Sequence, residues 1–335
     1  MIAEILSSIL ETIGVENPRI PGAAPGATPG ATIVADARAW ALGALVLGAL
    51  FAGSSTLFVR LNELGPIASA FYRAFLALPA LYLWMRIEGR RGTGRAVPAR
   101  REYLLMGLAG LFFAGDLFFW HLAIMNTAVA NATLLATLSP VYVTAILFLV
   151  FRERVRPLFL GGTALAVAGA GLLMGDSFAF RPDRLAGDAY GLVTGLFLAG
   201  YMVSVGRLRL GGGAGARIGT GTLMFWSTLV TAAVLFCLAW AAEDRLLAFT
   251  PFGWAMLVTL ALVSHVAGQG LVALAMAHLP TAFASVGLIM EVVAAAVLGW
   301  VFLDEPLSAL QWLGAAVVVC GVAVARRGSA SSPRE

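Results

Sequence analysis

The feature that most constrains the fold of this chain is a series of ten apolar runs, each long enough to cross a lipid bilayer. A helix needs about 20 apolar residues to span the ~30 Å hydrocarbon layer, because it rises about 1.5 Å per residue. Charged or turn residues separate the runs, which predict spans at 39–59, 66–86, 104–125, 128–150, 157–174, 187–206, 219–241, 253–275, 280–302 and 307–325. The expected fold class is therefore all-α integral membrane, with ten transmembrane helices.

Composition supports a membrane protein and excludes an ordinary soluble domain. Hydrophobic residues make up 60% of the chain and charged residues 12%, about half the usual charged share of a soluble domain. A net charge of +4 then indicates basic loops facing anionic lipid, so we expect membrane lipid and no nucleic acid among the partners. Cys237 and Cys320 lie inside apolar runs and indicate neither a disulfide framework nor a metal site.

The distribution of arginine predicts the orientation of the spans. All 22 basic residues are arginine, and with the N-terminus inside, 17 lie on inner segments and 4 on outer ones, while Arg73 lies within a span. By the positive-inside rule, both termini are expected in the cytoplasm.

The first 37 residues form a separate N-terminal tail. One face of a predicted helix in this tail is apolar and consists of Ile2, Ile5, Leu6, Ile9 and Ile13. A linker rich in Pro, Gly and Ala follows from Pro18 to Ala31. No basic segment precedes the apolar residues, which argues against a cleavable signal peptide. Two interpretations stay open, a surface helix and a start codon assigned too early.

An internal repeat divides the rest of the chain into two halves. Residues 121–155 align with 273–307 at a shift of 152, and residues 52–61 align with 199–208 at a shift of 147. The halves, residues 38–175 and 186–326, hold five spans each, and residues 327–335 form a C-terminal tail. An odd number of spans inverts the second half, and inverted repeats are typical of secondary transporters that bind substrate near the midplane.

The motifs of the repeat resemble those of a known family. The pattern ANATLLATLSPV with FRER, at residues 130–154, and its counterpart ending in LDEPL resemble the EamA family of the drug/metabolite transporter superfamily. The resemblance covers residues 39 to 326 and implies an inner-membrane permease, in many members an exporter of amino acids or related metabolites. Span nine has Glu291-Val292 where the family usually has a proline, so a helix break is predicted at Pro140 in span four but not in span nine.

Three charged residues inside the spans are the main candidates for a site. Arg73, Asp116 and Glu291 lie roughly 11, 14 and 16 Å from the outer ends of their spans, and His265 and Pro140 about 18 Å. Charged side chains at that depth cost about 2.5 to 3.5 kcal/mol each on insertion scales, so they indicate a partner or a role. Five features from five spans in one layer predict a central binding cavity.

The role of Arg73 has three interpretations. Its permanently charged guanidinium is expected to neutralise one acid, with Asp116 the first choice, which leaves the other acid as a candidate proton carrier. Alternatively, Arg73 binds a substrate carboxylate in bidentate fashion while Asp116 or Glu291 receives an amino group. The third interpretation is a purely structural ion pair between spans two and three.

Other polar residues of the spans complete the list of substrate or translocation candidates. Trp120 shares a helical face with Asp116 and is alternatively an interfacial anchor. His121 points elsewhere on that helix and is alternatively a helix-to-helix hydrogen-bond donor. Gln269 shares a face with His265, beside glycines that equally suit tight packing, and Tyr201 either contacts substrate or fills the core.

The inverted repeat and the charged layer predict a secondary transporter that works by alternating access, and the resemblance implies an exporter of amino acids or related small metabolites. Proton coupling is a hypothesis that depends on the surplus of one acid over one arginine. The sequence lacks a P-loop, HExxH, clustered Cys/His ligands and paired aspartate motifs, so we expect no enzyme activity, no cofactor and no metal. The alternatives are a membrane-embedded enzyme or lipid-handling protein, and broad-specificity drug efflux. We expect a small-molecule substrate and a monomer or homodimer.

Overall fold

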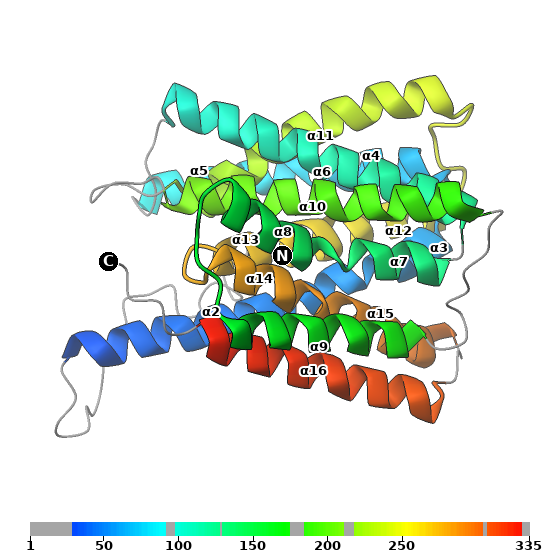
Figure 1. The fold of residues 1–335 in the computed structure, drawn as a ribbon. Helices are drawn as coiled ribbons and strands as arrows, with labels where there is room; N and C mark the ends of the chain where they lie inside the picture. The colour runs from blue at the N-terminus through cyan, green and yellow to red at the C-terminus, as the bar shows by residue number, and fades with distance from the viewer. Residues whose placement is uncertain are drawn as a thin grey trace.

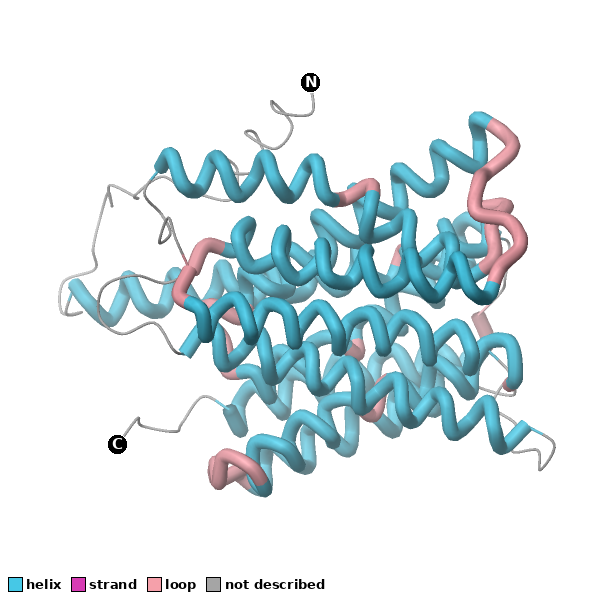
Figure 2. Tube along the Cα trace, turned by 90° about the horizontal axis from the view of Figure 1, so that it is seen from above, coloured by secondary structure: helices cyan, strands magenta, loops and turns pink. Residues whose placement is uncertain are grey.

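The computed structural model describes residues 29–91, 98–127, 129–174, 184–210, 218–303 and 307–329. Within them, ten helical stretches are long and apolar enough to cross a membrane. They run from one end of the molecule to the other, with the connections gathered at the two ends (Figures 1 and 2). The ten-span prediction is confirmed, and the stretches begin and end within a few residues of the predicted spans. Residues 1–28, which hold most of the N-terminal tail, lie outside the described part.

Five spans consist of one uninterrupted helix. These are spans three, five, six, seven and ten, formed by α6 (Arg100–Asn126), α9 (Pro157–Met174), α10 (Leu185–Leu210), α11 (Thr220–Ala242) and α16 (Ala309–Ser329). In each, the helix satisfies its own backbone hydrogen bonds, which lipid cannot do.

The other five spans are interrupted partway. They are α2 (Pro29–Gly53) with α3 (Ser55–Leu61), α4 (Pro66–Phe75) with α5 (Leu78–Arg91), α7 (Val129–Ala136) with α8 (Ser139–Leu149), α12 (Pro251–Thr259) with the π-helical η3 (Leu260–Gln269) and α13 (Gly270–Ala275), and α14 (Thr281–Leu288) with α15 (Met290–Leu303). Such breaks are tolerated at membrane depth where they are buried in protein or line a cavity. Helix α2 begins at Pro29, within the stretch interpreted as a linker.

The break in span nine corrects a prediction from the sequence. Spans four and nine are interrupted at equivalent positions, α7 ending at Ala136 and α14 at Leu288, which are 152 residues apart. In span nine the Ile289 amide donates to the Val286 carbonyl at 3.1 Å, an i to i+3 bond that tightens the turn without a proline. Tertiary packing accounts for the break, because a Cβ on Gly53 of α2 would lie 2.5 Å from the Glu291 carbonyl oxygen.

The helices pack with the symmetry of an inverted repeat. Helix α6 lies along α10, and the equivalent pair α2 and η3 lie along each other. Helices α9 and α16 form a third interface, visible along the lower edge of Figure 1. Glycines allow that close approach, because a Cβ on Gly169 would lie 2.6 Å from the Val318 amide nitrogen.

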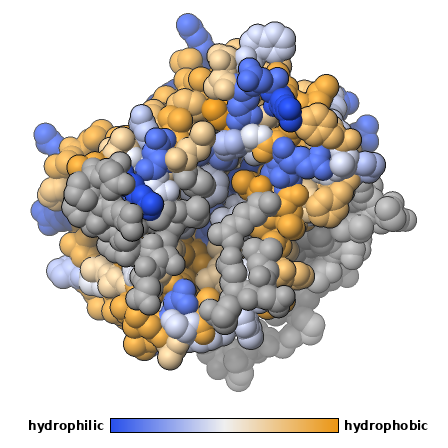
Figure 3. All heavy atoms as spheres, turned by 90° about the vertical axis from the view of Figure 1, so that its right-hand side faces the viewer, coloured by the Kyte–Doolittle hydropathy of each residue, from blue (hydrophilic) through white to orange (hydrophobic). Residues whose placement is uncertain are grey.

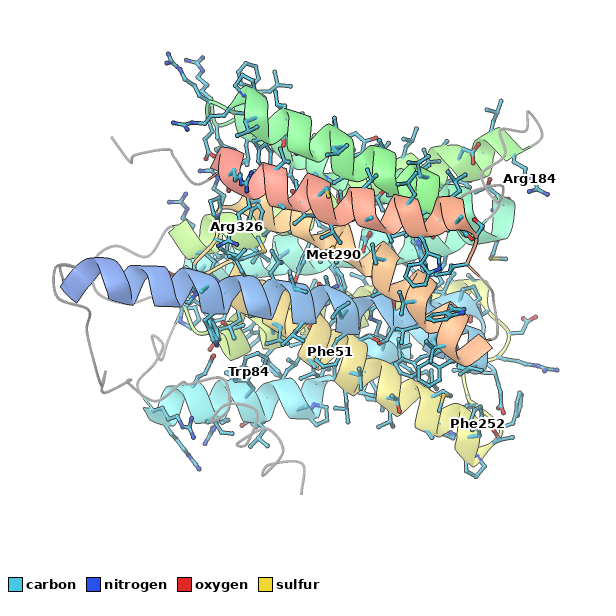
Figure 4. All side chains as sticks on the ribbon, turned by 90° about the horizontal axis from the view of Figure 1, so that it is seen from below. Phe51, Trp84, Arg184, Phe252, Met290 and Arg326 are labelled. Carbon is cyan, nitrogen blue, oxygen red and sulfur yellow. The ribbon has the colours of Figure 1, made fainter. Side chains whose placement is uncertain are left out.

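The two ends of the bundle differ in charge. The arginine-rich end holds the C-terminal ends of α5, α10 and α16 and the residues that follow α8, including Arg91, Arg207 and Arg326. The arginine-poor end holds the start of α12 and residues 62–65. Figure 4 shows Arg326 at the former end and Arg184 and Phe252 at the latter, with Met290 between them.

Candidate functional site

A cavity of about 110 Å³ lies among seven of the ten spans. None of its lining residues belongs to α5 or α13, the segments of spans two and eight nearest the arginine-rich end. The cavity therefore lies toward the arginine-poor end, where the surface is hollowed at its centre (Figure 3).

Five of the nine candidate residues predicted from the sequence line this cavity. They come from spans two, three, eight and nine and are Arg73, Asp116, Trp120, Gln269 and Glu291. Each break brings a helix end into the membrane interior, so Gly53, Ser139 and Leu288 also reach the wall. A midplane cavity at interrupted helices is the usual position of a transporter substrate site.

Of the residues that the structure describes around the cavity, Arg73 is the only basic one. Its side chain is 6% exposed, and its guanidinium carbon lies 5.9 Å from the centre of the Phe113 ring. Among the described residues, no carboxylate lies within 4.0 Å of it and its Nε has no hydrogen-bond partner. The direct pair expected between Arg73 and Asp116 is therefore not formed. A buried guanidinium without a partner can accept an anionic group from a ligand.

Asp116 and Glu291 provide two acids on the same wall. Asp116 lies within the uninterrupted α6 and is 9% exposed, whereas Glu291 lies in the first turn of α15 and is half-buried. The first turn of a helix favours a negative charge, because unpaired amide groups point out of that end. The cavity thus places one positive and two negative groups around an open space.

Hydroxyl groups form much of the remaining wall, and reasoning from the sequence missed them. They belong to Ser55, Thr56, Thr133, Thr137, Ser139 and Thr194. One signal was present, because Ser139 aligns with Glu291 in the repeat at the shift of 152. Isolated hydroxyl residues in apolar spans otherwise give no sign of which face they occupy.

The other four candidates lie outside the cavity wall. Tyr201 and His265 are buried beside Phe113, with ring centres 5.0 and 5.5 Å from it. The His265 Nε2 and the Thr228 hydroxyl lie 2.8 Å apart, within hydrogen-bond distance. His265 therefore lies in the core, whereas Gln269, four residues later in η3, lines the cavity.

His121 and Pro140 have local roles in their own helices. The His121 Nδ1 lies 2.5 Å from the Leu117 carbonyl of the same helix, so the helix-to-helix bond weighed for it is not the one formed. Pro140 is buried in the first turn of α8, where it leaves no amide hydrogen unpaired. Neither residue touches the cavity.

Two glutamates tie the halves together at the arginine-poor end. Glu63, which follows α3, accepts hydrogen bonds from the Thr250 hydroxyl and from the amides of Phe249 and Thr250 at 3.1 and 3.2 Å, at the start of α12. Glu243, which follows α11, accepts bonds from the Ile67 and Ala68 amides at the start of α4 at 2.7 and 3.1 Å. Each half therefore caps a helix of the other half.

Comparison with known proteins identifies the family. The profile of the EamA-like transporter family matches residues 39–175 and 185–327. The pseudopaline exporter CntI of Pseudomonas aeruginosa is 28% identical over 79% of this chain and 90% of its own length. The uncharacterized transporter YwfM of Bacillus subtilis is 29% identical over 60% of this chain and 66% of its own.

Two further matches extend the comparison. An uncharacterized transporter of Archaeoglobus fulgidus is 32% identical over 48% of this chain, and the match spans only 55% of that protein. A solved crystal structure superposes with a TM-score of 0.70 at 20% identity, covering 86% of this chain and 99% of the other, which supports the fold. The family and the relatives are transporters rather than enzymes. Two matched repeats, ten apolar helices and transporter relatives together show that this chain is a membrane-spanning member of the EamA-like transporter family.

Proposed function

We propose that this protein exports small amphoteric metabolites of the amino-acid type across a bacterial inner membrane by alternating access, with both termini in the cytoplasm. The observation that carries the proposal is the cavity in which Arg73, Asp116 and Glu291 face one space without an ion pair among the described residues. Charged groups are costly inside a membrane, so an unpaired set of both signs is retained where a ligand supplies the missing partners.

The arrangement assigns complementary roles to the charged residues. Arg73 binds the carboxylate of the substrate through its planar guanidinium, and Asp116 or Glu291 receives the amino group. The acid that remains is the candidate proton carrier. Export as the direction is supported by the likeness to the pseudopaline exporter, which aligns over most of both chains.

Broad drug efflux fits the cavity less well. The aromatic side chains of its wall are those of Phe113 and Trp120, and charged and hydroxyl side chains outnumber them. A site for large apolar cations is expected to be mostly aromatic, because such ligands are held by ring faces and apolar area.

Flux measurements in proteoliposomes test the proposal. We expect the protein to move radiolabelled amino acids, and expect either Asp116→Asn or Glu291→Gln, but not both, to abolish the effect of an imposed pH gradient. Equal gradient dependence in wild type and both variants would refute proton coupling. Chemical conversion of a lipid without solute movement would refute transport itself.

A further inference from the structure

Three threonines of the cavity wall present only hydrogen-bond acceptors to the open space. Each donates its hydroxyl hydrogen to the backbone carbonyl of a residue three or four positions earlier. The bonds run from Thr56 to Gly53 at 2.9 Å, from Thr137 to Leu134 at 2.6 Å and from Thr194 to Tyr190 at 3.0 Å. A hydroxyl has one hydrogen to donate and two lone pairs. The oxygens that line the cavity are therefore left to accept.

Gln269 adds an acceptor that has no partner. Its side chain is 4% exposed and lines the cavity, and its Oε1 makes no hydrogen bond with any part of the chain that the structure describes. The equivalent position of the other repeat, 152 residues earlier, is Leu117, which lines the same cavity with an apolar side chain. A buried carbonyl oxygen without a donor is costly, so Gln269 calls for a donor group from a ligand.

The charges of the cavity wall also favour a ligand with an additional hydrogen-bond donor. Two carboxylates, Asp116 and Glu291, face one guanidinium, Arg73, so the ionised wall carries one negative charge in excess. An ordinary zwitterion offers one carboxylate and one ammonium group, which pair with Arg73 and one acid. The second acid, the threonine oxygens and Gln269 are then still without donors.

Building on the proposed function, we infer that the cavity selects amino acids whose side chain carries a further N–H or O–H donor, a diamino or hydroxyamino carboxylate, and that Gln269 reads this donor. A second ammonium group satisfies the surplus acid as well as the acceptor wall. An apolar side chain of the same size leaves these acceptors buried and unpaired, and an acidic side chain adds a third carboxylate to two. Gln269 is thus a specificity-determining residue.

A matched set of three amino acids tests the inference on the full chain in proteoliposomes. Ornithine, norleucine and glutamate have side chains of similar length that end in a donor, an apolar group and an acceptor. We expect uptake of labelled ornithine to be inhibited by unlabelled ornithine at a concentration at least about tenfold lower than by norleucine, and not by glutamate.

Gln269→Leu, which copies the residue of the other repeat, is expected to narrow the preference for ornithine over norleucine toward unity. Thr137→Val is expected to narrow the same preference independently, and it tests the inference if Gln269→Leu does not fold. Thr259→Val is the matched control, because this hydroxyl lies on the same span, bonds to the Ala255 carbonyl at 2.8 Å and does not line the cavity.

The outcomes separate the inference from the proposed function. Equal transport of ornithine and norleucine, or a preference that both cavity variants leave unchanged, overturns the donor selectivity and leaves amphoteric transport standing. Movement of none of the three amino acids overturns both.

Discussion

Ser139 and Glu291 occupy equivalent positions in the two repeats and line the same cavity. Each lies within the first two residues of the helix that follows the break, Ser139 in α8 and Glu291 in α15. The two repeats therefore have similar backbones at the break but different side chains, since one repeat presents a hydroxyl and the other a carboxylate. Because the two repeats have nearly the same backbone, each can adopt the conformation that the other has in this structure. Glu291, which lies at the break in span nine, would stay near the centre of the molecule in both of these states.

When each repeat adopts the conformation of the other, we expect the cavity to close at the arginine-poor end and a second cavity to open at the arginine-rich end. Thr133 lines the present cavity, whereas its equivalent in the second repeat, Ser285, is fully buried. In a variant without Cys237 and Cys320, we expect Thr133→Cys to react with a membrane-impermeant thiol reagent from the arginine-poor side only. Ser285→Cys is expected to react from the arginine-rich side during transport.

A buried position away from the path is the control for this labelling. Ala166 is fully buried where α9 packs against α16, so Ala166→Cys is expected to stay unlabelled. Continued transport while Ser285→Cys never reacts would show that the repeats do not exchange conformations in this way.

Replacing Arg73 is expected to change which part of a substrate is recognised. Without its guanidinium the carboxylate loses a charge-assisted pair, a loss of about 1.5 to 3 kcal/mol or roughly a tenfold to hundredfold weaker interaction. In Arg73→Leu, ornithine uptake should fall by that factor relative to uptake of putrescine, its analogue without the carboxylate. Arg245→Leu, at an exposed position of the arginine-poor end, is the control. An unchanged ratio of ornithine to putrescine uptake would exclude Arg73 as the carboxylate partner.

Two adjacent glycines of α9 should respond oppositely to alanine. A Cβ on Gly162 would lie 2.3 Å from the Ala325 amide nitrogen of α16, whereas a Cβ on Gly161 meets nothing within 4 Å. Gly162→Ala is therefore expected to lower the thermal unfolding midpoint in detergent, because α9 and α16 must separate. Gly161→Ala should leave it unchanged or raise it, since alanine favours a helix by up to about 1 kcal/mol. Equal midpoints for the two variants would mean that this contact does not limit stability.

Glu63 should make stability depend on pH in the acid range. The hydrogen bond from the Thr250 hydroxyl, with those from the Phe249 and Thr250 amides, holds the pKa of Glu63 below its ordinary value of 4.5. A lowered pKa stabilises the folded state above the ordinary value, and this contribution is lost as pH falls through the lowered one. Glu63→Gln should therefore lower the unfolding midpoint at pH 7.

The difference between Glu63→Gln and wild type should vanish as the pH is taken well below 4.5. Asp244→Asn, an exposed acid of the same end, is the matched control and should show no such difference. A Glu63→Gln difference that stays constant from pH 7 into the acid range would assign the effect to packing rather than to the charge.

Ten spans, two inverted halves and a charged midplane layer follow from the sequence alone, because the bilayer imposes a length on each apolar run and a cost on each buried charge. The same reasoning placed Arg73, Asp116 and Glu291 at similar depth without fixing which of them touch. It also placed His265 and Gln269 on one helical face, although only Gln269 lines the cavity.

Only the tertiary structure decided which of these residues share a cavity and which helices break. Span nine breaks without a proline because α2 packs its glycine against the Glu291 backbone, a contact between segments distant in the sequence. The threonine oxygens become a wall of acceptors only because three separate spans turn them toward one space. Local sequence fixes the length and polarity of each helix, whereas the packing of distant helices fixes the direction in which each polar side chain points.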